Sequence, residues 1–175
     1  MNNTHQQPQS TSSIDPSEKQ RIASNPAQSV WVDASAGTGK TKILTDRVLR
    51  LLLSDADRPA SPPERIVCIT FTKAAASEMS LRITKTLSKW SIIDDEWLSN
   101  IGQRNSLADV LGTPPSPQQL KEARTLFARV IDVPGGLKIM TIHACCQSIL
   151  QKFPRESGLS PNFTVLTVPE AKETI

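Results

Sequence analysis

Eight consecutive residues near the start of the chain have the composition of a phosphate-binding loop. They are Ala34, Ser35, Ala36, Gly37, Thr38, Gly39, Lys40 and Thr41. Gly37 and Gly39 allow backbone N–H groups to turn inward around a phosphate, where side chains would obstruct them. Lys40 can place its ammonium on the β- and γ-phosphates, and the Thr41 hydroxyl can bind Mg²⁺. The spacing predicts a nucleotide site, and the alternative is a glycine turn that only joins a strand to a helix.

The elements that would hold this loop follow from the apolar pattern. The short apolar run Val30–Val32 leads into the loop, and a helix is expected over residues 40–53. Its predicted apolar face consists of Leu44, Val48, Leu51 and Leu52. A strand is expected over Ile66–Ile69, followed by a helix capped by Thr72. The predicted apolar face of that helix consists of Ala76, Met79, Ile83 and Leu87.

The second half of the chain repeats this alternation after a less regular stretch. Residues 89–116 are interpreted as an irregular insertion, and Ser116 starts the next helix, with an apolar face of Leu120, Ala123, Phe127 and Val130. A strand over Leu137–Thr141 precedes a helix over His143–Phe153 that would bury Cys146, Ile149, Leu150 and Phe153. Phe163–Leu166 and Pro169–Ala171 are a further strand and a helix start. Alternating strands and helices predict an α/β fold with a parallel sheet covered by helices on both faces.

Composition narrows the class of protein. The chain has 175 residues, with Lys+Arg 20 against Asp+Glu 17, and this weak basic excess does not itself predict nucleic-acid binding. No apolar run approaches the roughly 18 residues of a membrane span, and no secretory signal is visible. Cys68, Cys145 and Cys146 form no disulfide framework, which favours a cytoplasmic protein. Residues 1–17 are polar and predict a disordered tail, which leaves residues 18–175 as the folded part.

Three strings together resemble the superfamily 1 helicases of the UvrD/Rep type. They are VDASAGTGKT, ITFTKAAASEM from Ile69 to Met79, and TIHACCQSILQKFP from Thr141 to Pro154. Within that family the chain is most similar to the N-terminal part of the AddA helicase-nuclease subunits of double-strand break repair. The resemblance covers roughly residues 16–175. It implies a RecA-like P-loop domain that binds ATP and Mg²⁺, with Lys40 and Thr41 as catalytic residues and Thr41 on the metal.

The resemblance also implies roles for residues outside the loop. Gln20 corresponds to a glutamine that reads adenine through one donor and one acceptor, and the alternative is an ordinary solvated glutamine. Contacts to single-stranded DNA are implied for Thr70, Phe71, Thr72, Lys73, Thr141 and His143. For Phe71 the alternative is a core position between strand and helix, for Lys73 a solvated lysine, and for His143 a capping or core residue.

Some parts of a complete motor are missing from this sequence. No apolar run is followed by a Walker B acid pair, since Asp94, Asp95 and Glu96 follow only Ile92 and Ile93 in the irregular stretch. We therefore expect an incomplete first motor domain of a 3′–5′ helicase, inactive alone, whose full-length family acts on single-stranded and duplex DNA with an AddB-like partner subunit. The alternatives are another P-loop enzyme, such as a small-molecule kinase, and a non-catalytic nucleotide-binding fragment.

Overall fold

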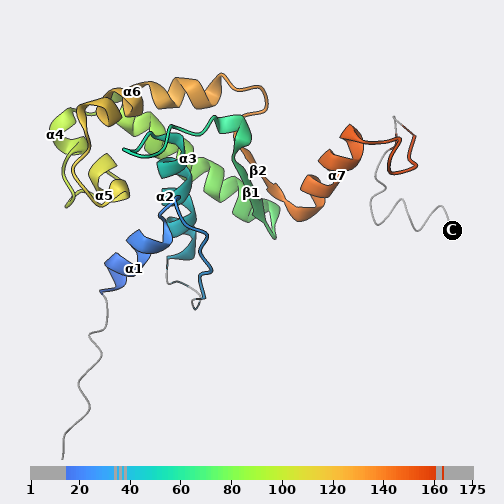
Figure 1. The fold of residues 1–175 in the computed structure, drawn as a ribbon, viewed down its shortest axis with the longest axis horizontal. Coiled ribbons are helices and arrows are strands. Elements are labelled where there is room, and N and C mark those ends of the chain that lie inside the picture. Colours follow the sequence, from blue (N-terminus) through green and yellow to red (C-terminus); the bar gives the residue numbers. More distant parts are fainter. Residues whose placement is uncertain (1–14, 34, 36, 38, 161–162, 164–175) are drawn as a thin grey trace, which may run out of the picture.

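The computed structural model describes residues 15–33, 35, 37, 39–160 and 163 (Figure 1). The first half contains α1 (Pro16–Ala23), α2 (Lys40–Leu52), a 3₁₀ turn (Pro63–Arg65), β1 (Val67–Thr70) and α3 (Lys73–Ile92). The second half contains α4 (Asp95–Leu98), α5 (Leu107–Leu111), α6 (Pro117–Ile131), β2 (Lys138–Thr141) and α7 (Ile142–Lys152). Among these helices, none combines the length and apolar character that a membrane crossing requires.

The strands β1 and β2 pair in parallel, as predicted. Val67 lies opposite Lys138 and Thr70 opposite Thr141, with α3 to α6 forming the connection between the strands. Helix α3 packs against both strands, but Val67 and Ile69 are 51% and 54% exposed. The α/β prediction is thus confirmed, whereas the prediction of helices on both faces is wrong for the described residues. Alternate side chains of a strand point to opposite faces, and no described element covers the face of Val67 and Ile69.

The apolar run before the phosphate loop does not form a strand. Residues 30–32 pair with neither β1 nor β2, and Trp31 is 94% exposed. The strand–loop–helix context expected from the sequence is therefore present only from the loop onward. The predicted strand at Phe163–Leu166 falls mostly outside the described residues, and Phe163 itself is not in a strand. The helix start at residues 169–171 also lies outside them.

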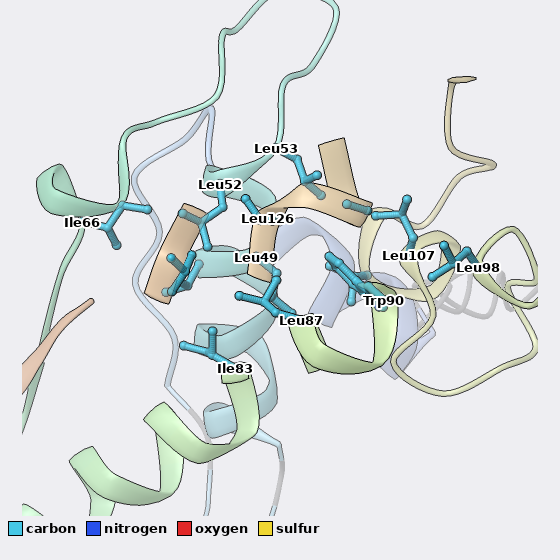
Figure 2. Packing of buried hydrophobic residues seen from close by; sticks show 14 of the residues in the cluster. Leu49, Leu52, Leu53, Ile66, Ile83, Leu87, Trp90, Leu98, Leu107 and Leu126 are labelled. Atoms are coloured by element: carbon cyan, nitrogen blue, oxygen red, sulfur yellow. The ribbon is translucent and has the colours of Figure 1, made fainter. Parts of the chain in front are cut away.

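One hydrophobic core lies between the long helices. It is built mainly from α2, α3, α5 and α6, and Figure 2 shows its side chains gathered between them with Trp90 fully buried. Helix α3 contributes a stripe at intervals of three and four residues, which consists of Met79, Ile83, Leu87 and Trp90. This periodicity directs one side of a helix inward. The prediction for this helix is confirmed for Met79, Ile83 and Leu87, whereas Ala76 is only half-buried.

The apolar face of α2 differs from the prediction by a small rotation. Leu44 is 52% exposed and Leu51 is half-buried, whereas the buried apolar residues of the helix are Ile43, Val48, Leu49 and Leu52. The predicted stripe took its first position from Leu44, while packing selects Ile43. Positions three, four and seven apart from Thr45 share the inward face, and this face carries Val48, Leu49 and Leu52.

The stretch interpreted as an irregular insertion is part of the core. Residues 89–92 are the last turn of α3, and α4 and α5 fold back so that Leu98, Leu107 and Val110 are buried. The Trp90 indole N–H donates to the carbonyl of Asn105 at 2.9 Å, which fixes the segment between α4 and α5. This segment looks irregular in sequence because its helices are short, and its burial depends on contacts with distant residues.

Helix caps follow the sequence closely. The Ser116 hydroxyl accepts from the backbone N–H of Gln119 at 3.2 Å, and the Gln119 side chain accepts from Ser116 N–H at 2.9 Å, which completes a capping box. Helix α6 turns Ala123, Leu126 and Val130 inward. Of its predicted face, Leu120 and Phe127 are half-buried, and Leu126 was not predicted.

The two ends of the described chain depart from the predictions. Helix α7 buries no residue, and the side chains predicted to face inward are exposed or only partly buried: Cys146, Ile149, Leu150 and Phe153. In Figure 1 this helix projects away from the other helices. At the other end, the predicted tail of residues 1–17 overlaps α1, because Pro16 and Ser17 are already helical. Residues 1–14 lie outside the described part.

The burial of Trp90 predicts a large effect of its removal. Trp90→Ala leaves a cavity between α3 and the α4–α5 segment and removes the bond to Asn105, so we expect a loss of about 3–5 kcal/mol in the free energy of unfolding. Urea unfolding followed by circular dichroism measures it. Trp31→Ala is the matched control, and its exposed position predicts a change within about 0.5 kcal/mol. Equal effects of the two exchanges would contradict the described core.

Candidate nucleotide-binding site

The phosphate loop ends where α2 begins. Gly39 is the N-terminal cap residue of α2, with φ of 92°, and Gly37 has φ of 81°. Both values lie in the region that favours glycine. A Cβ on Gly39 would lie 3.0 Å from the Gln20 side-chain nitrogen, so glycine also allows α1 to approach the loop. Of the predicted loop residues, Ala34, Ala36 and Thr38 lie outside the described part.

Lys40 lies across the loop at the first turn of α2. Its ammonium donates to the carbonyl of Ser35 at 2.8 Å, and the side chain is exposed. Thr41 follows, and its backbone carbonyl accepts from the Thr45 hydroxyl at 2.8 Å. The first N–H groups of a helix lack partners within the helix, and its dipole favours negative charge at that end. The loop, the helix end and Lys40 therefore converge on one place where an anion would be stabilised.

An open pocket of about 640 Å³ lies at this place. It brings together the predicted nucleotide residues that the structure describes, except Ser35, with three cations that the sequence analysis did not single out. The lining consists of Gln20, Gly37, Gly39, Lys40, Thr41, Lys42, Arg82 and Arg104. Four of these side chains are cationic, and none is a carboxylate. A concave surface with this charge attracts a polyanion such as a triphosphate.

The three additional cations come from three parts of the fold. Lys42 lies one residue after the loop sequence, Arg82 is on α3, and Arg104 is between α4 and α5. Arg82 donates to Glu78 at 2.6 Å. Asn105, next to Arg104, is held by the indole of Trp90 and by the Asp109 carboxylate at 2.9 Å. Apart from the nearness of Lys42 to the loop, no spacing in the sequence links these residues, since only the packing of α3 and α5 against α2 brings them together.

A second, smaller cavity of about 270 Å³ adjoins the first along α2. The two cavities share Lys42, Arg82 and Arg104. Asp46 lines the smaller one, where its carboxylate accepts from Lys42 at 2.7 Å. Burial raises the pKa of Asp46, and the hydrogen bond and charge of Lys42 oppose that shift. Because Lys42 is also 3.5 Å from Asp109, much of its positive charge is balanced inside the protein.

The residues present fit a magnesium ion that enters with a nucleotide. Mg²⁺ bound to nucleotides takes few ligands from the protein and the rest from phosphates and water. Thr41 lines the pocket and offers one hydroxyl oxygen. No group of three or more His, Cys, Asp or Glu side chains suited to a metal occurs within the described ranges. Thr41 is thus the side chain that would hold the ion beside the phosphates.

The acids considered for Walker B have structural partners. The Asp94 carboxylate accepts from the backbone N–H of Trp97 at 2.7 Å and caps α4, while Asp95 pairs with Arg124 of α6. Neither acid lines the pocket of the phosphate loop. Their place in the fold agrees with the interpretation that they do not serve the nucleotide.

The predicted DNA contacts gather at one edge of the sheet. Thr70 and Thr141 are register partners at the carboxyl ends of β1 and β2, which is the edge where parallel sheets bind ligands. Thr72 caps α3 by accepting from Ala75 N–H at 3.1 Å. Thr141 caps α7 in the same way through Ala144 N–H at 3.3 Å. Two helix N-termini therefore begin at this edge, and both favour phosphate.

The aromatic and charged members of this group face solvent. Phe71 is 90% exposed, which excludes the core alternative for it in this structure. Lys73 and His143 are also exposed. The cysteines nearby are free thiols, with Cys145 half-buried and Cys146 exposed. Burial raises the pKa of Cys68 on β1, which keeps that thiol protonated.

Comparison with known proteins gives one consistent result. Residues 14–175 match the family of the UvrD/REP helicase N-terminal domain. A protein of Pediococcus pentosaceus, named as an ATP-dependent helicase/nuclease subunit of the AddA type, is 29% identical over 89% of this chain. Proteins of the same name from Lactobacillus gasseri and Carboxydothermus hydrogenoformans are 31% and 30% identical over 86% and 87% of it.

The chain spans 10% of the length of each of these three relatives. The family match nevertheless covers all the elements described above, including the phosphate loop, the pocket beside α2 and the carboxyl edge of the sheet. The cationic pocket at a glycine loop and the family match point the same way, and this chain belongs to the UvrD/REP helicase N-terminal domain family.

Proposed function

We propose that this chain binds Mg·ATP in the pocket at the N-terminus of α2, as part of a RecA-like motor domain of a 3′–5′ DNA helicase. One observation carries the proposal: the loop glycines, Lys40 and the cations Lys42, Arg82 and Arg104 line a single pocket that holds no carboxylate. The triphosphate supplies the energy of the motor when it is hydrolysed. The protein groups bind and orient it, which is the main task of proteins in phosphoryl transfer.

The roles proposed for the pocket residues follow from their places. Lys40 and the N–H groups of the first turn of α2 hold the phosphates, and Thr41 holds Mg²⁺. Gln20 lies against Gly39 and reads adenine, because its amide offers a donor and an acceptor to the matching pair on the base.

The DNA partner is proposed for the carboxyl edge of β1 and β2. The hydroxyls of Thr70, Thr72 and Thr141, together with Lys73 and His143, can contact phosphates. The exposed ring of Phe71 can stack on a base, since stacking on aromatic rings is a common way to hold single strands. By the names of its relatives, the proposal extends to double-strand break repair and to an AddB-like partner subunit.

The contribution of Lys40 predicts a loss of affinity when it is removed. Lys40→Ala deletes a charge-assisted bond of roughly 1.5–3 kcal/mol, so the affinity for Mg·ATP should fall by about 10- to 100-fold. Calorimetric titration measures it. Lys121→Ala on the exposed side of α6 lines no described pocket and should bind as the parent does. Equal affinity of the parent and Lys40→Ala would reject the assignment of the pocket.

These residues alone are expected to bind nucleotide and single-stranded DNA without unwinding a duplex. No Walker B acids and no second motor domain are evident in the sequence, and translocation needs two domains that close and open around ATP. Strand displacement on a duplex with a 3′ tail should give no product, while fluorescence anisotropy should detect weak, salt-sensitive binding of the single strand. Unwinding by this chain that Lys40→Ala abolishes would contradict the expectation.

A further inference from the structure

Helix α1 carries Gln20 to the phosphate loop, yet it buries none of its residues. Ile22, its large apolar side chain, is 45% exposed. Burial of apolar area is the usual force that docks a helix, and here it contributes little. The position of Gln20 therefore depends on polar contacts between α1 and its neighbours.

Two arginines of α2 supply those contacts. Arg50 donates through Nη1 to the carbonyl of Arg21 at 3.1 Å and to the Ser24 hydroxyl at 3.0 Å. Ser24 is buried, and its hydroxyl donates in turn to the Arg21 carbonyl at 3.0 Å. The last carbonyls of a helix lack partners within the helix and carry its negative dipole end. Arg50 thus neutralises the C-terminal end of α1.

Arg47 holds the chain that leaves α1. Its Nη1 donates to the carbonyl of Asn25 at 2.5 Å and its Nη2 to the carbonyl of Gln28 at 2.6 Å. A guanidinium can bridge two carbonyls in this way because its donors form a rigid fork. Arg47 and Arg50 are three positions apart and share one face of α2. This face lies beside α1, whereas Leu49 and Leu52 turn into the core.

A third contact closes off the other side of α1. A Cβ on Gly112, the cap residue of α5, would lie 2.2 Å from Cδ of Arg21. Gly112 also has φ of 76°, so glycine is required there on two counts. Helix α1 is therefore confined between the arginines of α2 and the end of α5.

We infer that Arg47 and Arg50 are positioning residues for base recognition. They tie the helix that carries Gln20 to the helix whose first turn forms the phosphate site, so the distance between adenine reader and phosphate site is set within one rigid unit. The inference rests on the proposed function, in which Gln20 reads adenine. Neither arginine touches the nucleotide, and both act through α1.

The structure offers a matched control in Arg58. Its guanidinium also donates to backbone carbonyls at the C-terminal end of a helix, namely Arg50 at 2.6 Å and Leu53 at 3.0 Å. Arg58 follows α2 rather than facing α1, and it lines neither cavity at the phosphate loop. Its removal should cost stability in a similar way while Gln20 stays in place.

The test compares affinities for Mg·ATP, Mg·GTP and Mg·tripolyphosphate by calorimetry. The proteins are the parent chain, the double variant Arg47→Ala/Arg50→Ala, Arg58→Ala and Gln20→Ala. We expect the preference for ATP over GTP to fall by about three- to ten-fold in the double variant and in Gln20→Ala, as the loss of one or two base hydrogen bonds implies. Affinity for tripolyphosphate should change by less than about two-fold, because Lys40 and the loop are untouched.

Further variants keep the test decisive if the double variant does not fold. Ser24→Ala removes one acceptor of Arg50 and should lower the preference in the same direction by a smaller factor. Arg47→Lys/Arg50→Lys keeps the charges without the fork and should restore part of the preference. Circular dichroism melts show which variants are folded at the temperature of the titrations.

The possible failures are distinguishable. An unchanged preference in the double variant, together with a lost preference in Gln20→Ala, would overturn the inference and leave the proposed function intact. A drop in preference for Arg58→Ala as large as in the double variant would also overturn it, because the effect would then be general destabilisation. A parent chain that binds no Mg·ATP, or shows no preference over GTP, would refute the proposed function itself.

Discussion

The packing of α2 into the core is the interaction on which the other features of this structure depend. Leu49 and Leu52 of α2 are buried against the core stripe of α3, which fixes the helix as a rod that rises about 1.5 Å per residue. Its first turn carries Lys40 and Thr41 to the phosphate loop. A second face carries Arg47 and Arg50 to α1. One buried face therefore determines where the phosphate site and the adenine reader stand relative to one another.

The distribution of charge around α2 explains why the loop attracts anions despite the weak net charge of the chain. Lys42 is balanced by Asp46 and Asp109, and Arg82 is paired with Glu78. Within the described chain Arg104 has no ion-pair partner. The pocket lining itself contains four cations and no carboxylate, so positive charge is concentrated at the loop. A net charge of +3 spread evenly over the surface would produce no such focus.

Local signals in the sequence predicted the features that depend on neighbouring residues. Thr72 and Ser116 are caps, the α3 stripe is buried, and Gly37 and Gly39 have positive φ, because each depends on a few adjacent positions. Features set by distant packing were not predictable in this way. Arg82 and Arg104 reach the pocket only through the tertiary fold, and the α4–α5 segment enters the core through Trp90. The strand expected around Trp31 and the inward face assigned to α7 were wrong because an apolar pattern shows which side chains could be buried, not whether a partner surface is present.

The central claim is that nucleotide binding and the core share one helix, so binding should stabilise the whole fold. Urea unfolding followed by tryptophan fluorescence, at increasing concentrations of Mg·ATP, tests this most directly. At a ligand concentration about 100 times the dissociation constant, the free energy of unfolding should rise by about 2.7 kcal/mol. An unfolding midpoint that stays constant across the whole range of Mg·ATP concentrations would contradict the claim.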